Sequence, residues 1–140
     1  MKAILITIGF LTLVFVAKAQ QTDSVKKGSA DTTIYDNPAT PPEFPGGRTK
    51  LYAALYKNVH YPAKAKEDNI QGIVVLDIVI EKDGSITNIT VKKSVAPVLD
   101  NEVIRIVKLL PKFIPGKDKN GQPVRSYLDL PYSFTLATDN

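Results

Sequence analysis

The 140-residue sequence contains no cysteine and a single histidine, His60. Without cysteine the chain has no disulfide, no thiol nucleophile and no Cys-based zinc site. His60 has no second histidine and no carboxylate cluster around it at metal-ligand spacing, and no serine stands in the setting of a nucleophile elbow. We therefore predict a protein that is not an enzyme and that binds no metal and no cofactor. A small secreted hydrolase that uses His60 is an alternative.

The sequence also lacks a large surplus of charge of one sign. It has 18 Lys and Arg against 14 Asp and Glu, a formal net charge of +4. Two of the basic residues, Lys2 and Lys18, precede Gln20, so that residues 20–140 carry 16 basic and 14 acidic side chains. Chains that bind nucleic acid usually carry a basic stripe interleaved with aromatic residues, whereas here the two signs are mixed. We expect no nucleic-acid partner.

The apolar run at residues 3–16 is shorter than a membrane-spanning helix, which requires about 20 apolar residues. It follows Lys2 and precedes Ala17 and Ala19, small residues at the two positions that a signal peptidase reads. We predict that residues 1–19 are a signal peptide cleaved before Gln20. An uncleaved membrane anchor is the alternative.

The remainder divides into a polar segment and a folded domain. Residues 20–42 are poor in large apolar side chains and contain Pro38, Pro41 and Pro42. Such a segment buries too little surface to offset its chain entropy, so we interpret it as a flexible tether. The folded domain is predicted over residues 43–140.

Apolar periodicity predicts the elements of this domain. Residues 48–58 and 97–110 have helical spacing, and a short helical turn follows Pro62. Residues 72–81 are apolar on both faces, which is typical of a central strand. A turn leads into a second strand at residues 86–94, where a phase change predicts a bulge.

The last strand, at residues 124–136, alternates between apolar and polar residues with a period of two. Pro131 lies inside it, and because proline cannot donate to a sheet ladder, this strand belongs at an edge. An edge strand with open hydrogen-bonding groups is either a liability or a docking surface. We interpret it as a docking surface, because no other part of the sequence offers chemistry.

These elements leave few topologies. The hairpin makes the first two strands antiparallel, and the crossover helix returns the third strand to the other side of the first. The sequence therefore predicts an α+β fold, a small antiparallel three-stranded sheet of order two-one-three packed by two helices.

Short motifs along the predicted domain resemble the C-terminal domain of the TonB family. Each is weak alone, but together they follow in the order and at the spacing of the family. They are Pro42-Glu43-Phe44-Pro45-Gly46-Gly47, Tyr61-Pro62 with Ala65, Ile70-Gln71-Gly72 with Val74-Val75, Asp83-Gly84-Ser85-Ile86, Ser94 with Leu99-Asp100 and Glu102, Phe113-Ile114-Pro115-Gly116, Gly121-Gln122-Pro123-Val124, and Leu130-Pro131-Tyr132-Ser133-Phe134. The sequence resembles the free-standing TonB-like proteins of Gram-negative envelopes.

This resemblance implies a function. TonB proteins couple a proton-driven inner-membrane motor to outer-membrane transporters, and their C-terminal domain grips a short extended peptide of the transporter, the TonB box. The resemblance implies a periplasmic module that binds the TonB box of an outer-membrane TonB-dependent transporter by edge-strand addition and supports energy-coupled nutrient import. In the family the peptide pairs with the last strand. Carried over by position, the binding residues are Arg125, Ser126, Tyr127, Leu128 and Asp129.

Two alternatives stay open at this stage. If residues 1–19 are cleaved, nothing in residues 20–140 connects the domain to the motor. An uncleaved amino terminus would instead give a transducer that is anchored in the inner membrane, faces the periplasm and engages the motor. The second alternative is a structural or interaction module that forms a homodimer through the same edge strand, without motor coupling.

Overall fold

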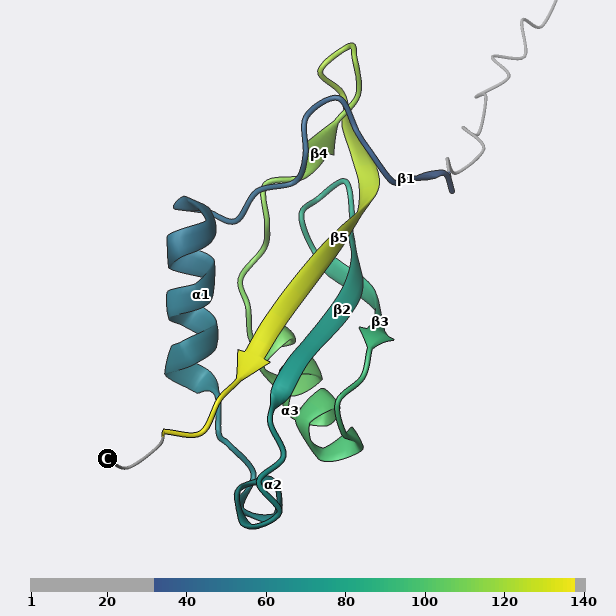
Figure 1. Cartoon of the computed structure of the whole chain (residues 1–140). Helices are drawn as coiled ribbons and strands as arrows, with labels where there is room; N and C mark the ends of the chain where they lie inside the picture. The colour runs from purple at the N-terminus through teal and green to yellow at the C-terminus, as the bar shows by residue number, and fades with distance from the viewer. Residues whose placement is uncertain (1–31, 138–140) are drawn as a thin grey trace, which may run out of the picture. The chain divides into compact units, whose positions relative to one another are not determined.

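The computed structural model describes residues 32–137 (Figure 1). The predicted signal peptide and the first part of the predicted tether, residues 20–31, lie outside the described residues. Helices and strands follow in the order β1 (Ile34–Tyr35), α1 (Gly47–Asn58), α2 (Ala63–Glu67), β2 (Gly72–Ile80), β3 (Ile86–Lys93), α3 (Pro97–Val107), β4 (Gly116–Lys117) and β5 (Pro123–Phe134).

The sheet has the order β1-β5-β2-β3, and β4 also pairs with β5. β2 lies at the centre, antiparallel to β3 on one side and to β5 on the other (Figure 1). Val74, Leu76 and Ile78 lie on one face of β2 and are fully buried. On the other face Val79 is buried but Ile73 is 45% exposed, so the second apolar face of this central strand is only partly covered. The predicted order of the three long strands is confirmed.

The predicted numbers of strands and helices were wrong. Residues 32–137 contain five strands and three helices, where the sequence predicted a three-stranded sheet and two helices. β1 and β4 have only two residues each, too few for a period of two to be visible. The helical turn expected after Pro62 is the five-residue helix α2.

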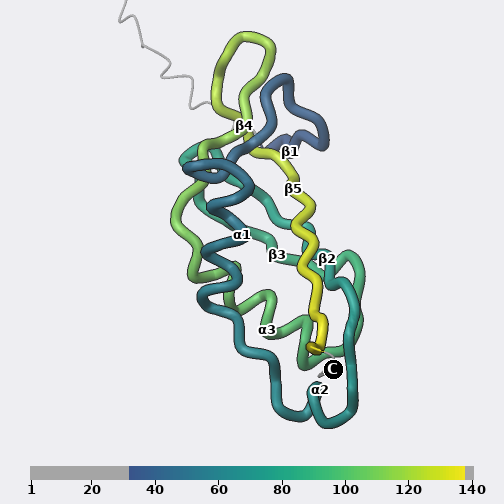
Figure 2. The backbone as a smooth tube through the Cα atoms, turned by 60° about the vertical axis from the view of Figure 1, so that its left-hand side comes forward, coloured from purple at the N-terminus to yellow at the C-terminus, as the bar shows by residue number. Residues whose placement is uncertain are grey.

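α1 and α3 lie on one side of β2 and β5 (Figure 2). Their buried side chains recur at helical spacing and meet the inward-facing side chains of the strands in one core. The core side chains of α1, α3 and β5 are Leu51, Leu55, Leu99, Val103, Ile106, Val107, Leu130, Tyr132 and Phe134. One face of the sheet is thereby covered, and β5 is fixed on the side that faces β2.

The turn between β2 and β3 packs against the segment that follows α3. Gly84 has φ +86°, and a Cβ atom on it would lie 1.9 Å from the carbonyl oxygen of Phe113. The Phe113 N–H donates to the Gly84 carbonyl at 2.8 Å. Only glycine allows this approach, because any other side chain would collide with backbone.

Residues before the predicted domain boundary at Glu43 also pair with the folded domain. β1 pairs with β5, and Thr40 and Lys117 exchange backbone hydrogen bonds of 2.9 Å in both directions. Residues 32–42, hereafter the strap, therefore belong to the folded unit and not to the tether. Composition does not reveal this, because backbone pairing orders most of the strap, and Pro42 is its only buried residue.

Candidate functional site

β5 has an open side. It pairs with β2 from Ser126 to Phe134. On the side away from β2, β1 pairs only with Arg125 and Ser126. β4 pairs with Pro123 and Val124, which precede the residues of β5 that pair with β2. In the described part of the chain no strand lies beside β5 on that side beyond Ser126.

Backbone hydrogen-bonding groups point to this open side at every second residue. Pro131 lies opposite Val75 of β2. Because Pro131 has no N–H, this is not a hydrogen-bonded pair, and its carbonyl points away from β2. The Tyr52 hydroxyl donates to that carbonyl at 3.1 Å. With a period of two, the N–H and C=O groups of Tyr127 and Asp129 point the same way.

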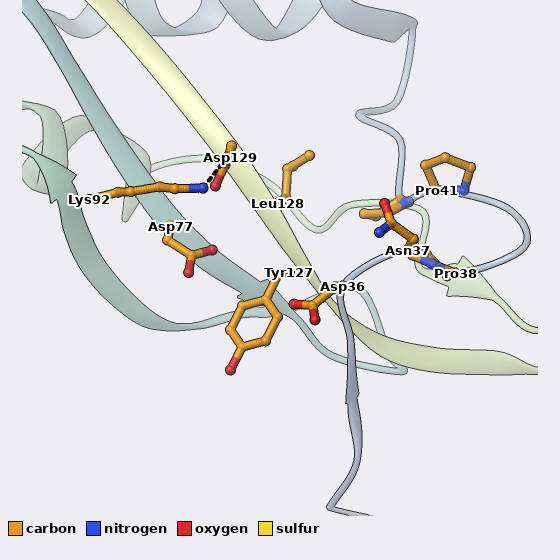
Figure 3. A pocket seen from close by; sticks show the side chains of 10 residues that line it. Asp36, Asn37, Pro38, Pro41, Asp77, Lys92, Tyr127, Leu128 and Asp129 are labelled. Atoms are coloured by element: carbon orange, nitrogen blue, oxygen red, sulfur yellow. Dashed lines mark hydrogen bonds and ion pairs between the residues drawn. The ribbon is translucent and has the colours of Figure 1, made fainter.

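A cavity of about 590 Å³, hereafter the edge groove, lies between this part of β5 and the strap. Its lining residues are Asp36, Asn37, Pro38, Pro41, Pro42, Asp77, Lys92, Tyr127, Leu128 and Asp129 (Figure 3). Sequence reasoning missed the wall formed by the strap. Its three prolines were the available signal, because they hold the backbone extended without a helix or a ladder.

The edge groove is acidic. Asp36, Asp77 and Asp129 line it together with one cation, Lys92, whose Nζ lies 2.6 Å from Asp129 Oδ2 (Figure 3). Asp77 stands directly opposite Asp129, where like charges repel. Burial, followed by the Asp129 charge, raises the pKa of Asp77, although Lys92 opposes the shift. The groove therefore favours a cationic or neutral side chain over an acidic one.

A second hollow of about 210 Å³, lined mostly by apolar side chains and hereafter the apolar hollow, shares Leu128 with the edge groove. It is lined by Pro42, Glu43, Phe44, Arg48, Leu51, Phe113 and Leu128. Two of its aromatic rings, Phe44 and Phe113, contact each other edge to face with centroids 5.3 Å apart. β5 thus has an acidic hollow beside Tyr127, Leu128 and Asp129 and an apolar hollow that it reaches through Leu128 alone.

The structure separates the predicted binding residues into two groups. Arg125 and Ser126 are covered by β1. The Arg125 Nε lies 2.7 Å from Glu81 Oε2, and its Nη1 donates to the Thr32 carbonyl at 3.0 Å. Hydrogen bonds from Arg125, with a contribution from Thr87, lower the pKa of Glu81. Ser126 is fully buried.

The second group, Tyr127, Leu128 and Asp129, lines the edge groove. The Tyr127 side chain is 37% exposed, and in Figure 3 it lies next to Asp36 of the strap. These three residues are brought together beside open backbone groups. Arg125 is turned toward Glu81 instead.

His60 belongs to a polar cluster that joins the end of α1 to α3. Its backbone N–H donates to Glu102 Oε1 at 2.7 Å. Arg105 Nη2 lies 2.6 Å from the same oxygen and donates to the Asn58 carbonyl at 2.8 Å. The hydrogen bond from Arg105 is the main cause of the lowered pKa of Glu102. These contacts fit a structural role for the histidine region.

Two features are absent from the part of the chain that the structure describes. Within residues 32–137 no three side chains of His, Cys, Asp or Glu are grouped to hold a metal ion. No helix in that range has the length and apolar character needed to cross a membrane.

Comparison with known proteins gives consistent matches. The family model of the Gram-negative bacterial TonB protein C-terminal matches residues 57–136. Protein TonB of Helicobacter pylori (strain J99 / ATCC 700824) is 25% identical over 120 residues, which are 85% of this chain and 40% of that protein. The chain thus spans less than half the length of this relative. The NMR solution structure of Helicobacter pylori TonB-CTD has 26% identity and a TM-score of 0.50, and the match covers 65% of this chain and 81% of that one.

Proposed function

Because this chain belongs to the family of Gram-negative TonB protein C-terminal domains, we propose that it binds the TonB box of an outer-membrane TonB-dependent transporter along the open side of β5. The peptide adds a strand to the sheet and so contributes to energy-coupled nutrient import. The observation that carries the proposal is the open backbone of Tyr127 and Asp129, which faces the edge groove.

Strand addition would give the peptide two kinds of contact. Its backbone pairs with the outward N–H and C=O groups of Tyr127 and Asp129, which supplies affinity. Its side chains alternate between the two faces of the sheet. One set enters the edge groove beside Asp77 and Asp129, and the other enters the apolar hollow beside Leu128. We therefore expect apolar residues to alternate with basic or neutral ones in a peptide that binds well.

A pair of substitutions at Asp129 tests the pairing. Proline at this position removes the outward N–H but no hydrogen bond to β2, since Pro131 already occupies an equivalent position two residues on. Asp129→Ala removes the same carboxylate and keeps the N–H. A fluorescein-labelled synthetic TonB-box peptide, from a transporter of the same organism, is titrated into each variant and followed by anisotropy.

We expect Asp129→Pro to bind roughly tenfold more weakly than Asp129→Ala, because one net hydrogen bond contributes about 0.5–1.5 kcal/mol and the proline ring crowds the incoming strand. Circular dichroism and urea denaturation confirm that both variants are folded. Equal affinities in two folded variants would remove strand addition at this edge from the mechanism.

Self-association through the same edge is a second candidate function, and the open strand that favours peptide binding favours it too. Sedimentation velocity of the protein without peptide separates the two. A mass that rises with concentration in Asp129→Ala, and not in Asp129→Pro, would assign the edge to a second copy of the chain. A monomer mass that does not change with concentration would argue against self-association and support peptide binding at this edge.

We further propose that the domain acts in the periplasm, exported by residues 1–19. Amino-terminal sequencing and fractionation of the protein from its own cell envelope test this. A start at Gln20 in the soluble periplasmic fraction identifies an accessory binder without motor coupling. An intact amino terminus in the inner membrane identifies an anchored transducer that engages the proton-driven motor.

A further inference from the structure

We propose that β1 is a displaceable occupant of the docking edge, so that a partner strand long enough to reach Arg125 exchanges with the chain's own Ile34 and Tyr35. This inference rests on the proposed function, because it concerns how that edge is regulated. It adds a competitor within the chain to a site that otherwise would be freely open.

The position of β1 carries the first step. Ile34 and Tyr35 pair with Arg125 and Ser126 in parallel register on the side of β5 away from β2. Arg125 lies two residues before Tyr127, and alternate residues of a strand point their backbone groups to the same side. Its N–H and C=O groups therefore continue the row of outward groups formed by Tyr127 and Asp129. β1 therefore occupies the first positions of the row that the partner strand would use.

Weak attachment of β1 carries the second step. Only two residues of β1 pair with β5, both are half-buried, and neither belongs to the hydrophobic core. The Arg125 side chain adds a hydrogen bond of 3.0 Å to the Thr32 carbonyl, next to β1. Few hydrogen bonds and little buried apolar surface are the features of a segment that opens locally at low free-energy cost.

The following part of the chain is attached more firmly. Thr40 exchanges two hydrogen bonds with Lys117, and Glu43 exchanges two with Ile114, at 2.8–3.0 Å. Phe44 is 7% exposed in the core. β1 can therefore leave β5 while the chain from Thr40 onward stays in place, with residues 36–39 as the connection.

Competition from β1 has a measurable size. A tethered segment acts at a high effective concentration, about millimolar for a short flexible connection, and the apparent affinity of a ligand falls with the fraction of molecules whose site is open. The effect should depend on peptide length. A peptide that pairs only with Tyr127–Asp129 does not meet β1, whereas one that continues to Arg125 does.

Two variants change the attachment of β1 to β5 in opposite ways: one weakens it and the other fixes it. Ile34→Gly with Tyr35→Gly weakens the strand without a change of charge or chain length. Tyr35→Cys with Ser126→Cys joins two residues that are register partners, in a chain with no other cysteine, so that oxidation holds β1 on β5 and reduction releases it. The probes are two labelled synthetic TonB-box peptides of the same transporter, about five and about ten residues long, the longer sufficient to span the strand edge at about 3.3 Å per residue.

We expect the diglycine variant to bind the ten-residue peptide roughly three- to tenfold more tightly than wild type. We expect the oxidised dicysteine variant to bind it at least tenfold more weakly than its own reduced form. The five-residue peptide should bind all forms alike. If the disulfide does not form, as judged by thiol titration, the diglycine variant decides alone.

Unchanged affinity of the longer peptide in the diglycine variant would overturn this inference and leave the proposed function intact. Weaker binding in that variant would also overturn it, since β1 would then be part of the binding surface. Failure of wild type to bind either peptide, at concentrations where it is folded, would instead remove the proposed function and this inference with it.

Discussion

β3 and β5, the two long strands that flank β2, differ in how well their outer edges are protected from pairing with another chain. β3 is irregular: its pairing with β2 shifts register twice, Asn88 has φ 48°, and the strand ends in Lys92 and Lys93. Bulges and lysines are the usual devices that keep an edge strand from pairing with another chain. β5 pairs with β2 in unbroken register over nine residue pairs.

This difference indicates that the sheet is protected at one edge and left available at the other. Protection of β3 costs regular hydrogen bonds, yet the sheet retains its order because β2 is held by β5 and by the core. On β5, only the first residues are covered, by the short strand β1. A sheet with one protected edge strand and one available edge strand is consistent with a docking role for the available strand.

The sharpest test of the availability of β5 compares its two sides by proline substitution. The Leu128 N–H points toward β2, opposite Ile78, so Leu128→Pro removes a ladder hydrogen bond and a packed side chain. We expect a loss of about 3 kcal/mol or more in unfolding free energy. Asp129→Pro, on the open side, should lose under about 1 kcal/mol, mainly the exposed pair with Lys92.

Urea denaturation measures both variants. If the two prolines destabilise equally, the assignment of inward and outward backbone groups on β5 is incorrect, and the docking proposal loses its geometric basis. The comparison also shows why Leu128→Pro is a poor binding test by itself, since unfolding would remove binding whatever the mechanism.

A substitution at the β3 bulge tests the protected edge. Asn88 has a positive φ, which costs a β-branched residue roughly 1–2 kcal/mol. Asn88→Val should lose about that amount of stability, while Asn88→Gly should stay within about 0.5 kcal/mol of wild type. Thermal unfolding of the two variants is the measurement. A Val variant as stable as wild type would mean that β3 can straighten, and that its irregularity is not fixed by the fold.

Much of this architecture could be predicted from the sequence. The apolar run at residues 72–81 identified the central strand, and Pro131 identified the edge strand, because both depend on local chemistry that one strand carries alone. The order of the three long strands followed from the hairpin and the single crossover helix. The expected bulge in the second strand corresponds to the register shifts between β2 and β3.

The short strand β1, the partner of Arg125 and the edge groove could not be predicted, because each depends on residues that come together only in the fold. β1 pairs with Arg125 and Ser126, and the chain after it is anchored where Thr40 pairs with Lys117. These partners all lie far from β1 in the sequence. For the same reason the sequence could not show that Arg125 is engaged by Glu81. The acidic groove was also hidden, since Asp36, Asp77, Lys92 and Asp129 come from four separate segments.

The ion pair of Arg125 with Glu81 marks where the covered part of β5 meets the end of β2. Both side chains are about one-fifth exposed, at 21% and 22%, and Glu81→Gln should cost about 1–2 kcal/mol at neutral pH. The lowered pKa of Glu81 sets the pH dependence. Ionised Glu81 contributes to the free energy of unfolding above its unfolded pKa, near 4.5. This contribution is lost as the pH falls through the pKa of Glu81 in the folded protein.

Denaturation of wild type and Glu81→Gln from neutral pH to about pH 3 follows this difference. The stability gap between them should shrink below about pH 4.5. A gap that persists at the acid end would mean that packing or the contact with Thr87, and not the charge, accounts for the effect.

The smallest expected effect concerns the acidic wall of the open edge. Asp77 and Asp129 face each other across β2 and β5, Asp77 Oδ1 has no hydrogen-bond partner, and the pKa of Asp77 is raised above 3.8 by burial and then by Asp129. The ionised form therefore costs stability above the folded pKa, and the cost disappears as the pH falls below the unfolded value. Asp77→Asn should stabilise the protein by roughly 0.5 kcal/mol at neutral pH, and by nothing below about pH 4.

The same substitution should weaken binding of a peptide that carries a lysine toward the edge groove by a few-fold, and should leave a peptide with glutamine at that position unaffected. A neutral residue would then be better for the fold and worse for recognition, which is the pattern expected where a charge is kept for binding. Lys93→Gln, a loss of charge on the protected β3 edge, is the matched control and should change neither peptide's affinity. If Asp77→Asn stabilises the sheet but binds both peptides as wild type does, the groove's charge has no part in selection, and β5 recognises its partner through backbone and apolar contacts alone.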